Sequence, residues 1–146
     1  MSLREFCKHP VVKISPDQNI LEACALLRKN HIGCIVVEED AQLCGILTDR
    51  DIALKVTGES RDPKVTKVRE IMTPRPVRVS VNNSLPELTA LMHAFHVRRV
   101  PVVNASHKTV GIITLDDVIA LLGVELADIG KSISQPLFGK PSESTA

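Results

Sequence analysis

Apolar and polar positions alternate along the first half of the chain in a pattern that predicts five short elements. Apolar runs at 34–37 and 43–47 predict two buried strands with a polar turn between them. Asn19, with Glu22 three residues later, predicts the start of a helix whose apolar side chains recur at helical spacing. A short strand before this helix and a short helix at 49–56 complete a β-α-β-β-α order.

The second half of the chain repeats this order. Arg4-Glu5-Phe6-Cys7 returns 65 residues later as Arg69-Glu70-Ile71-Met72. Gly45–Asp51 returns 66 residues later as Gly111–Asp117, so one residue is inserted in the second copy. Agreement in the same order at several places indicates an internal duplication.

The duplication predicts an α+β fold. A single β-α-β-β-α copy would leave one face of its sheet bare, so we expect the two copies to pack as a pseudo-twofold pair. Apolar helix surface left over then suggests a homodimer. The predicted segments are a first repeat at 3–57, a linker at 58–67, a second repeat at 68–123, and a C-terminal helix with a mobile tail at 124–146.

Each copy contains the motif Gly-Ile-x-Thr-x-x-Asp, in which a strand runs directly into a helix. Such a corner presents unpaired backbone N–H groups and the positive end of the helix dipole, which favour a phosphate. The hydroxyl of Thr48 or Thr114 can bond a phosphate or ribose oxygen. The carboxylates of Asp51 and Asp117 match the paired hydroxyls of a ribose. The same spacing also describes a capping box that only stabilises the helix, and both interpretations stay open.

Arginines distinguish the two copies. Arg98 and Arg99 enter a strand that is otherwise apolar. Neighbours on a strand point to opposite faces, so we expect one arginine to reach a cleft and the other to meet solvent, unless both are solvated. The first copy has no charge at these positions but carries Arg50 in its corner, where the second has Asp116. The arginine pair therefore predicts a phosphate near the cleft of the second copy.

Composition narrows the classes of partner. Aromatic residues make up only 2% of the chain, which argues against stacking platforms for single-stranded nucleic acid. The formal net charge of +1 lacks the basic excess of a protein that binds nucleic-acid backbones. No apolar run approaches the ~18 residues that span a bilayer, and the N-terminus has no signal-peptide pattern. We therefore expect a cytoplasmic protein that binds neither nucleic acid nor membranes.

The sequence contains no recognisable metal-binding or catalytic motif. The four cysteines are Cys7, Cys24, Cys34 and Cys44. None forms a CxxC pair, so we expect reduced thiols that pack as small apolar residues. His31 and His96 hold matching positions at the predicted helix ends, where interaction with carbonyls explains them. Since Gly-x-Ser-x-Gly, His-Glu-x-x-His and Walker motifs are also missing, we expect no bound metal and no enzymatic activity.

Together these motifs resemble the cystathionine-β-synthase (CBS) domain family. The resemblance covers about Leu3–Gly123 and is carried by the paired corner motifs, by Arg69–Thr73 and by His96–Val102. The combination is also similar to the stand-alone bacterial pairs, including the hypoxic-response type. The family implies a pseudo-twofold pair with a cleft between the copies, often assembled into a flat dimer. Many members bind AMP, ATP or S-adenosylmethionine there.

The corners, the arginines and the resemblance together imply a regulatory module that binds an adenine nucleotide between the repeats and requires no cofactor. The candidate nucleotide-binding residues are Thr48, Arg50, Asp51, Arg98, Arg99, Thr114 and Asp117. The residues implied to line the base are Val12, Val77 and Pro101. Two other functions stay open, namely a ligand-free scaffold that dimerises through its helices, and a small enzyme or metalloprotein. The sequence specifies no downstream protein partner.

Overall fold

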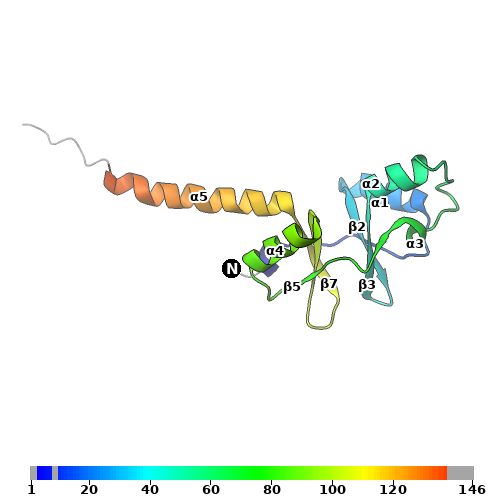
Figure 1. Cartoon of the computed structure of the whole chain (residues 1–146), viewed down its shortest axis with the longest axis horizontal. Coiled ribbons are helices and arrows are strands. Elements are labelled where there is room, and N and C mark those ends of the chain that lie inside the picture. Colours follow the sequence, from blue (N-terminus) through cyan, green and yellow to red (C-terminus); the bar gives the residue numbers. More distant parts are fainter. Residues whose placement is uncertain (1–2, 8–9, 138–146) are drawn as a thin grey trace, which may run out of the picture. The chain divides into compact units, whose positions relative to one another are not determined.

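The chain follows the predicted order of elements in both copies (Figure 1). The elements of the first copy are β1 (Lys13–Ile14), α1 (Ile20–Asn30), β2 (Cys34–Glu39), β3 (Gln42–Thr48), α2 (Asp49–Asp51) and the π-helical η2 (Ile52–Thr57). Those of the second copy are β5 (Val79–Ser80), α4 (Leu85–Phe95), β6 (Arg99–Val103), β7 (Thr109–Thr114) and α5 (Leu115–Leu137). Three short elements were not predicted, namely η1 (Leu3–Glu5), α3 (Val68–Ile71) and β4 (Thr73–Pro74). The α+β fold class is confirmed.

The structure is a computed structural model that describes residues 3–7 and 10–137. It divides into two compact units, one that ends at Ile113 and one that begins at Thr114. Within the described range, the second unit is α5 preceded by Thr114.

Two small sheets carry the two copies. The first has the strand order β1-β2-β3-β4, with β1 parallel to β2 and the other neighbours antiparallel. The second has the order β5-β6-β7, and β5 runs parallel to β6. Val36, Leu43 and Val103 form a buried cluster that joins the two sheets. β4 belongs to the second repeat of the sequence, yet it pairs with β3 and so completes the first sheet.

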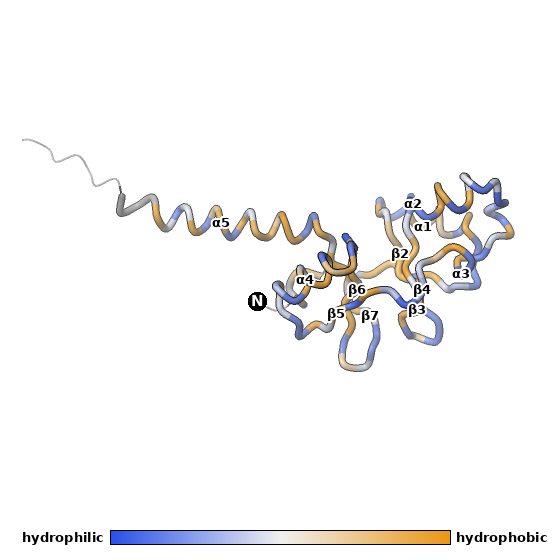
Figure 2. Tube along the Cα trace, viewed as in Figure 1, coloured by the Kyte–Doolittle hydropathy of each residue, from blue (hydrophilic) through white to orange (hydrophobic). Residues whose placement is uncertain are grey.

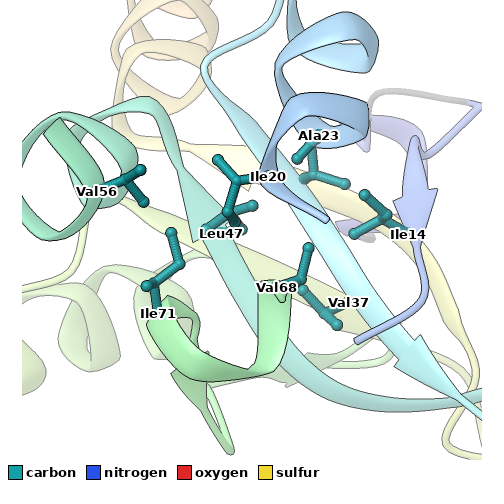
Figure 3. Close-up of a cluster of buried hydrophobic side chains, with 9 residues drawn as sticks. Ile14, Ile20, Ala23, Val37, Leu47, Val56, Val68 and Ile71 are labelled. Carbon is teal, nitrogen blue, oxygen red and sulfur yellow. The ribbon is translucent and has the colours of Figure 1, made fainter. Parts of the chain in front are cut away.

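The core of the first copy also includes a helix from the second repeat (Figure 3). The buried residues of this core are Ile14, Ile20, Ala23, Ile35, Val37, Leu47, Val56, Val68 and Ile71. Val68 and Ile71 come from α3, and burying such a side chain stabilises by about 1.5–3 kcal/mol. The N–H of Val68 donates to the carbonyl of Gln18 at 2.9 Å, and the N–H of Ile20 donates to that of Thr66 at 3.0 Å. The start of the second repeat is therefore fixed to the first copy.

Side-chain caps set where α1 and α4 begin. Asn19 caps α1 and Ser84 caps α4, and each belongs to a complete capping box with the third helical residue. Both of these predicted helix starts are confirmed. Both helices end at a histidine in the left-handed conformation, His31 and His96, each with φ 52°. Their backbone N–H groups donate to carbonyls of the last turn, as expected for residues at a helix end.

The C-terminal helix is longer than predicted. The sequence suggested a C-terminal helix that begins after the second repeat, within 124–146, whereas α5 begins at Leu115 and runs without a break through Gly123 and Gly130. A glycine in a helix costs about 1 kcal/mol relative to alanine, but its backbone can still adopt the helical conformation. Within the segment predicted to hold this helix and the mobile tail, residues 124–137 are helical, and residues 138–146 lie outside the described part of the chain.

Candidate functional site

A capping box closes the first strand-to-helix corner. β3 ends at Thr48, whose hydroxyl donates to Asp51 Oδ2 at 2.9 Å and whose N–H donates to the same oxygen at 3.0 Å. The N–H of Asp51 donates back to Thr48 Oγ1 at 3.1 Å. Lys55 Nζ lies 3.1 Å from Asp51 Oδ1 and also donates to the carbonyl of Ile71 at 2.8 Å. Thr48 and Asp51 therefore stabilise the start of α2.

The backbone amides of this corner are already bonded. The N–H of Asp49 donates to the carbonyl of Gly33 at 3.1 Å, and the N–H of Arg50 donates to Asp49 Oδ1 at 2.8 Å. Since the N–H of Asp51 bonds Thr48, all three amides of the first turn have partners. The prediction that bare amides would receive a phosphate here is wrong, because neighbouring groups of the chain occupy them.

Asp51 retains part of its hydrogen-bonding capacity. An ionised carboxylate offers about four acceptor positions. Asp51 Oδ2 accepts two bonds from Thr48, and Oδ1 is paired with Lys55, so roughly one position is left. The side chain of Asp51 is 16% exposed. Asp51 can therefore accept one hydroxyl of a ribose rather than the two suggested by the sequence, while the hydroxyl proton of Thr48 is committed to Asp51.

The second corner begins the second unit and has the same internal bonds. Thr114 Oγ1 donates to Asp117 Oδ2 at 2.7 Å, and the N–H of Thr114 donates to the same oxygen at 3.0 Å. The N–H of Asp117 donates to Thr114 Oγ1 at 3.1 Å. The duplicated motif thus folds into a duplicated cap.

A cavity of about 300 Å³ opens beside the first corner, and we call it the arginine cavity. It is lined by Ile46, Thr48, Asp51, Thr73, Arg75, Pro76, Val77, Val97, Arg98 and Arg99. Its volume falls at the lower end of the ~300–1,000 Å³ range of small-molecule sites. The lining has three arginines against one carboxylate, so it favours an anion.

Five predicted residues meet in the arginine cavity, namely Thr48, Asp51, Val77, Arg98 and Arg99. Both arginines line it and both are exposed, so the expectation that only one of them would reach a cleft is wrong. Arg98 precedes β6, so the alternation of a strand does not separate it from Arg99. The arginines also share this cavity with the corner of the first copy, whereas the sequence suggested the cleft of the second copy.

Arg75 is a lining residue that the sequence analysis missed. Its backbone is left-handed, with φ 46°, and its N–H donates to the carbonyl of Cys44 at 3.0 Å. A positive φ is uncommon for any residue other than glycine. The available signal was an arginine between Pro74 and Pro76, at a position where the first copy has Pro10.

Arg99 lies against the glycine that precedes β2. A Cβ atom added to Gly33 would lie 3.3 Å from Arg99 Nη2 and 3.0 Å from Asp49 Oδ2. A side chain at this position would therefore press on both charged groups. Gly33 leaves the space that Arg99 and Asp49 occupy.

A second cavity of about 80 Å³ occupies the position related by the repeat, and we call it the apolar cavity. It is lined by Pro10, Val11, Val12, Ile32, Cys34, Val36 and Ile112, none of which is charged. An offset of 65 residues pairs Val12 with Val77 of the arginine cavity. The same offset pairs Cys34 with Arg99. Burial raises the pKa of the Cys34 thiol to about 12, an effect that nearby Arg99 partly offsets, so the thiol is protonated at neutral pH.

Two candidate residues of the first unit line neither of these cavities. The side chain of Arg50 is exposed on the first turn of α2, and Pro101 is buried within β6. Val12 lines the apolar cavity, apart from the arginines. The predicted roles of Arg50 and Pro101 as nucleotide contacts thus gain no support from the cavity linings.

The described residues contain neither a metal-binding cluster nor a membrane-spanning helix. Within residues 3–7 and 10–137, no three or more His, Cys, Asp or Glu side chains lie close enough together to hold a metal ion. The same part of the chain has no helix with the length and apolar character needed to cross a membrane.

Comparison with known proteins identifies the family. The model of the CBS domain matches residues 3–58 and 68–124. The chain belongs to the CBS domain family. This CBS chain is 39% identical over 116 residues to the CBS domain-containing protein YhcV of Bacillus subtilis, covering 80% of this chain and 81% of that protein. It is 31% identical over 116 residues to Hypoxic response protein 1 of Mycobacterium tuberculosis, covering 79% of this chain and 80% of that protein.

Solved CBS structures share the fold. A crystal structure of Hypoxic Response Protein I with two coordinated zinc ions gives a TM-score of 0.74 at 30% identity, covering 82% of this chain and 98% of that one. The CBS domain pair of protein MJ0100, in complex with 5′-methylthioadenosine and S-adenosyl-L-methionine, gives a TM-score of 0.77 at 25% identity. This match covers 86% of this chain and 98% of that one. The resemblance suggested by the sequence motifs is confirmed.

Proposed function

We propose that this CBS chain is a non-catalytic regulatory module that binds an adenine nucleotide in the arginine cavity. The proposal is carried by the lining of that cavity, in which three arginines and one partly available carboxylate stand beside apolar side chains. A nucleotide offers groups that match each part: anionic phosphate, a hydroxylated sugar and a flat, largely apolar base. The 5′-methylthioadenosine and S-adenosyl-L-methionine bound to the MJ0100 pair support an adenosyl ligand.

Charge suggests which residues of the cavity contact each part of the nucleotide. Arg98 and Arg99 are the proposed phosphate ligands, with Arg75 on the same cavity wall. Each charge-assisted hydrogen bond contributes about 1.5–3 kcal/mol. Asp51 would repel a phosphate, so its remaining acceptor position is assigned to a ribose hydroxyl. Val77 is assigned to the base.

Other parts of the sequence-based hypothesis remain predictions. Thr114 and Asp117 repeat Thr48 and Asp51 in the sequence, and their predicted contact with a nucleotide is an alternative to the site proposed in the arginine cavity. A homodimer and a cytoplasmic location are likewise expected. The nucleotide would act by changing the geometry of the pair, which a protein partner would then detect.

A thermal-shift panel tests the proposal. AMP, ADP, ATP, NAD and S-adenosylmethionine are added separately to the full chain, with adenosine as the control that lacks phosphate. A ligand at a hundred times its Kd stabilises by about 2.7 kcal/mol, which corresponds to a rise in Tm of roughly 5–10 °C. We expect at least one nucleotide to give this shift and adenosine to give a smaller one. A flat panel would contradict nucleotide binding.

A ligand-free scaffold is the second candidate, and α5 is the observation that favours it. Leu122 and Leu126 on this helix are 45% and 68% exposed, which suits assembly rather than a monomer surface. A flat thermal-shift panel together with stable self-association would support this function.

A further inference from the structure

One arginine of the first sheet holds two carboxylates at once. Arg69, in α3, donates from Nε and Nη2 to Asp17 Oδ1 at 3.0 and 2.8 Å. Its Nη2 also donates to Glu39 Oε1 at 3.1 Å. Asp17 belongs to the turn before α1, and Glu39 is the last residue of β2, so a single guanidinium joins three segments. We call Arg69, Asp17 and Glu39 the carboxylate trio.

The second sheet has the same arrangement without the carboxylates. The 65-residue offset of the repeat relates the carboxylate trio to Arg4, Asn82 and Asn104. The turns before α1 and α4 also have the same local hydrogen bond, because the N–H groups of Asp17 and Asn82 each donate to the hydroxyl of the serine two positions earlier, at 3.3 and 3.2 Å. The arginine is therefore kept, while a neutral amide replaces each carboxylate.

A cavity of about 280 Å³ lies beside Arg4, and we call it the asparagine cavity. The described residues that line it are Arg4, Val81, Asn104 and Val110, all in the first unit. Val81 directly precedes Asn82 in the chain. The asparagine cavity is nearly as large as the arginine cavity and shares no lining residue with it. It is therefore a separate place where a small molecule could bind.

Hydrogen bonds fix the orientation of the Asn104 amide. Its Oδ1 accepts from the N–H groups of Ser106 at 3.0 Å and of Lys108 at 3.1 Å, within the turn between β6 and β7. Because an amide oxygen has two lone pairs, these two bonds use its acceptor capacity. The two N–H donors of Nδ2 have no partner among the described residues, so they are available to a ligand.

We propose that the asparagine cavity binds a small dicarboxylate, whose two carboxylates take the places that Asp17 and Glu39 hold in the carboxylate trio. A guanidinium has five N–H donors and one carboxylate uses two of them, so Arg4 can bind an anion beside any partner it already has. The Nδ2 group of Asn104 adds donors to the same lining. A ligand that only accepts hydrogen bonds matches this lining, and the carboxylate trio shows that one arginine can hold two carboxylates.

The charge of the neighbouring turns favours an anion in the second sheet only. Residues 38–40, where β2 turns toward β3, are Glu-Glu-Asp, and Figure 2 shows this turn as hydrophilic. Residues 104–108, between β6 and β7, are Asn-Ala-Ser-His-Lys and include no carboxylate. A free dicarboxylate would be repelled by the first turn but not by the second.

NMR titration of the full chain with succinate, at constant ionic strength, tests the proposal. We expect the side-chain amide signals of Asn104 to shift saturably, with a Kd in the millimolar range because water and salt weaken exposed charge pairs. Arg4→Gln should weaken this binding about tenfold or more. The matched control is Arg69→Gln, which removes the same charge from the carboxylate trio and should leave the succinate affinity unchanged. No saturable shift, or equal affinity in Arg4→Gln and the wild type, would overturn the proposal.

A carboxylate supplied by the chain itself should compete with the ligand. Asn82→Asp gives Arg4 the counterpart of Asp17, so we expect succinate binding to weaken about tenfold or more. Asn82→Ala, which adds no charge, should keep the affinity of the wild type. Equal affinity in Asn82→Asp and Asn82→Ala would contradict the placement of a ligand carboxylate at this position.

Two other anions test the class of ligand. Acetate, with one carboxylate, should bind more weakly than succinate, and inorganic phosphate should bind no more tightly. Phosphate that binds more tightly than succinate would overturn the assignment to a dicarboxylate. The thermal shift that AMP induces should be the same in Arg4→Gln and the wild type, because the two cavities share no lining residue.

Discussion

The arginine cavity and the apolar cavity are two versions of one architecture with different linings. The repeat relates them, yet one has about 300 Å³ and three arginines, and the other has about 80 Å³ and no charged lining residue. Arg99 stands where the apolar cavity has Cys34, and Arg75 stands where it has Pro10. The duplicated fold is thus retained while a few lining positions decide which cavity can attract an anion. We therefore expect one nucleotide per chain.

Removal of both central arginines should have the largest effect. Arg98→Gln combined with Arg99→Gln removes two charge-assisted bonds of about 1.5–3 kcal/mol each, so the affinity for AMP should fall by roughly 100-fold or more. Titration calorimetry measures the change. The control is Arg78→Gln, because Arg78 is exposed and lines neither cavity. Unchanged affinity in the double variant would mean that the arginines do not distinguish the two cavities.

Loss of the corner aspartates should separate the two copies. Asp51→Ala and Asp117→Ala each remove a capping box, so each should lower the free energy of unfolding by about 1 kcal/mol. Asp51→Ala should also weaken AMP binding by about tenfold, because it removes the proposed ribose contact. Asp117→Ala should leave the affinity unchanged. An equal loss of affinity in both variants would instead support the sequence-based assignment of Thr114 and Asp117 to a nucleotide site.

A smaller effect is expected at the glycine beside Arg99. In Gly33→Ala the new methyl group would press on Arg99 Nη2 and Asp49 Oδ2, so the arginine must shift by a few tenths of an ångström. We expect AMP affinity to fall about two- to fivefold, a difference of less than ~1 kcal/mol. Gly123→Ala is the matched control, since its Cβ would meet no atom within 4 Å. Tighter binding in Gly33→Ala would show that Arg99 is not yet positioned for a ligand.

The buried thiol of Cys34 in the apolar cavity should affect the stability of the fold only at high pH. Burial raises the pKa of Cys34 from 9.0 to about 12, so the folded state favours the protonated thiol. Its contribution to stability is therefore complete below pH 9 and is lost as the pH rises toward 12. Urea unfolding at pH 8 and pH 10.5 should show a larger decrease for the wild type than for Cys34→Ala. Equal decreases would indicate that the thiol is accessible to water.

Local patterns in the sequence predicted the parts of this molecule that local interactions determine. The capping boxes at Asn19 and Ser84 form between residues three positions apart, so their spacing alone predicts them. The duplication and the family resemblance could also be recognised in the sequence, because each corner motif keeps the same residues in the same order. Five of the candidate site residues then meet in one cavity.

Most of the features that were missed arise because segments of the second repeat pack on the first copy. α3 and β4 belong to the second repeat but pack on the first copy, and the sequence carries no local signal of this exchange. As a consequence, Arg98 and Arg99 share a cavity with Thr48 rather than lying near the second cleft as predicted. The bonded amide of Asp49 was missed for a different reason, since its partner is the carbonyl of Gly33, sixteen positions away in the same repeat.

The most direct test is a crystal structure of the full chain grown with AMP. The account predicts one nucleotide per chain, with its phosphate against Arg98 and Arg99 and its ribose at Asp51. A nucleotide bound only in the cavity around Cys34, or bound in both cavities alike, would contradict it.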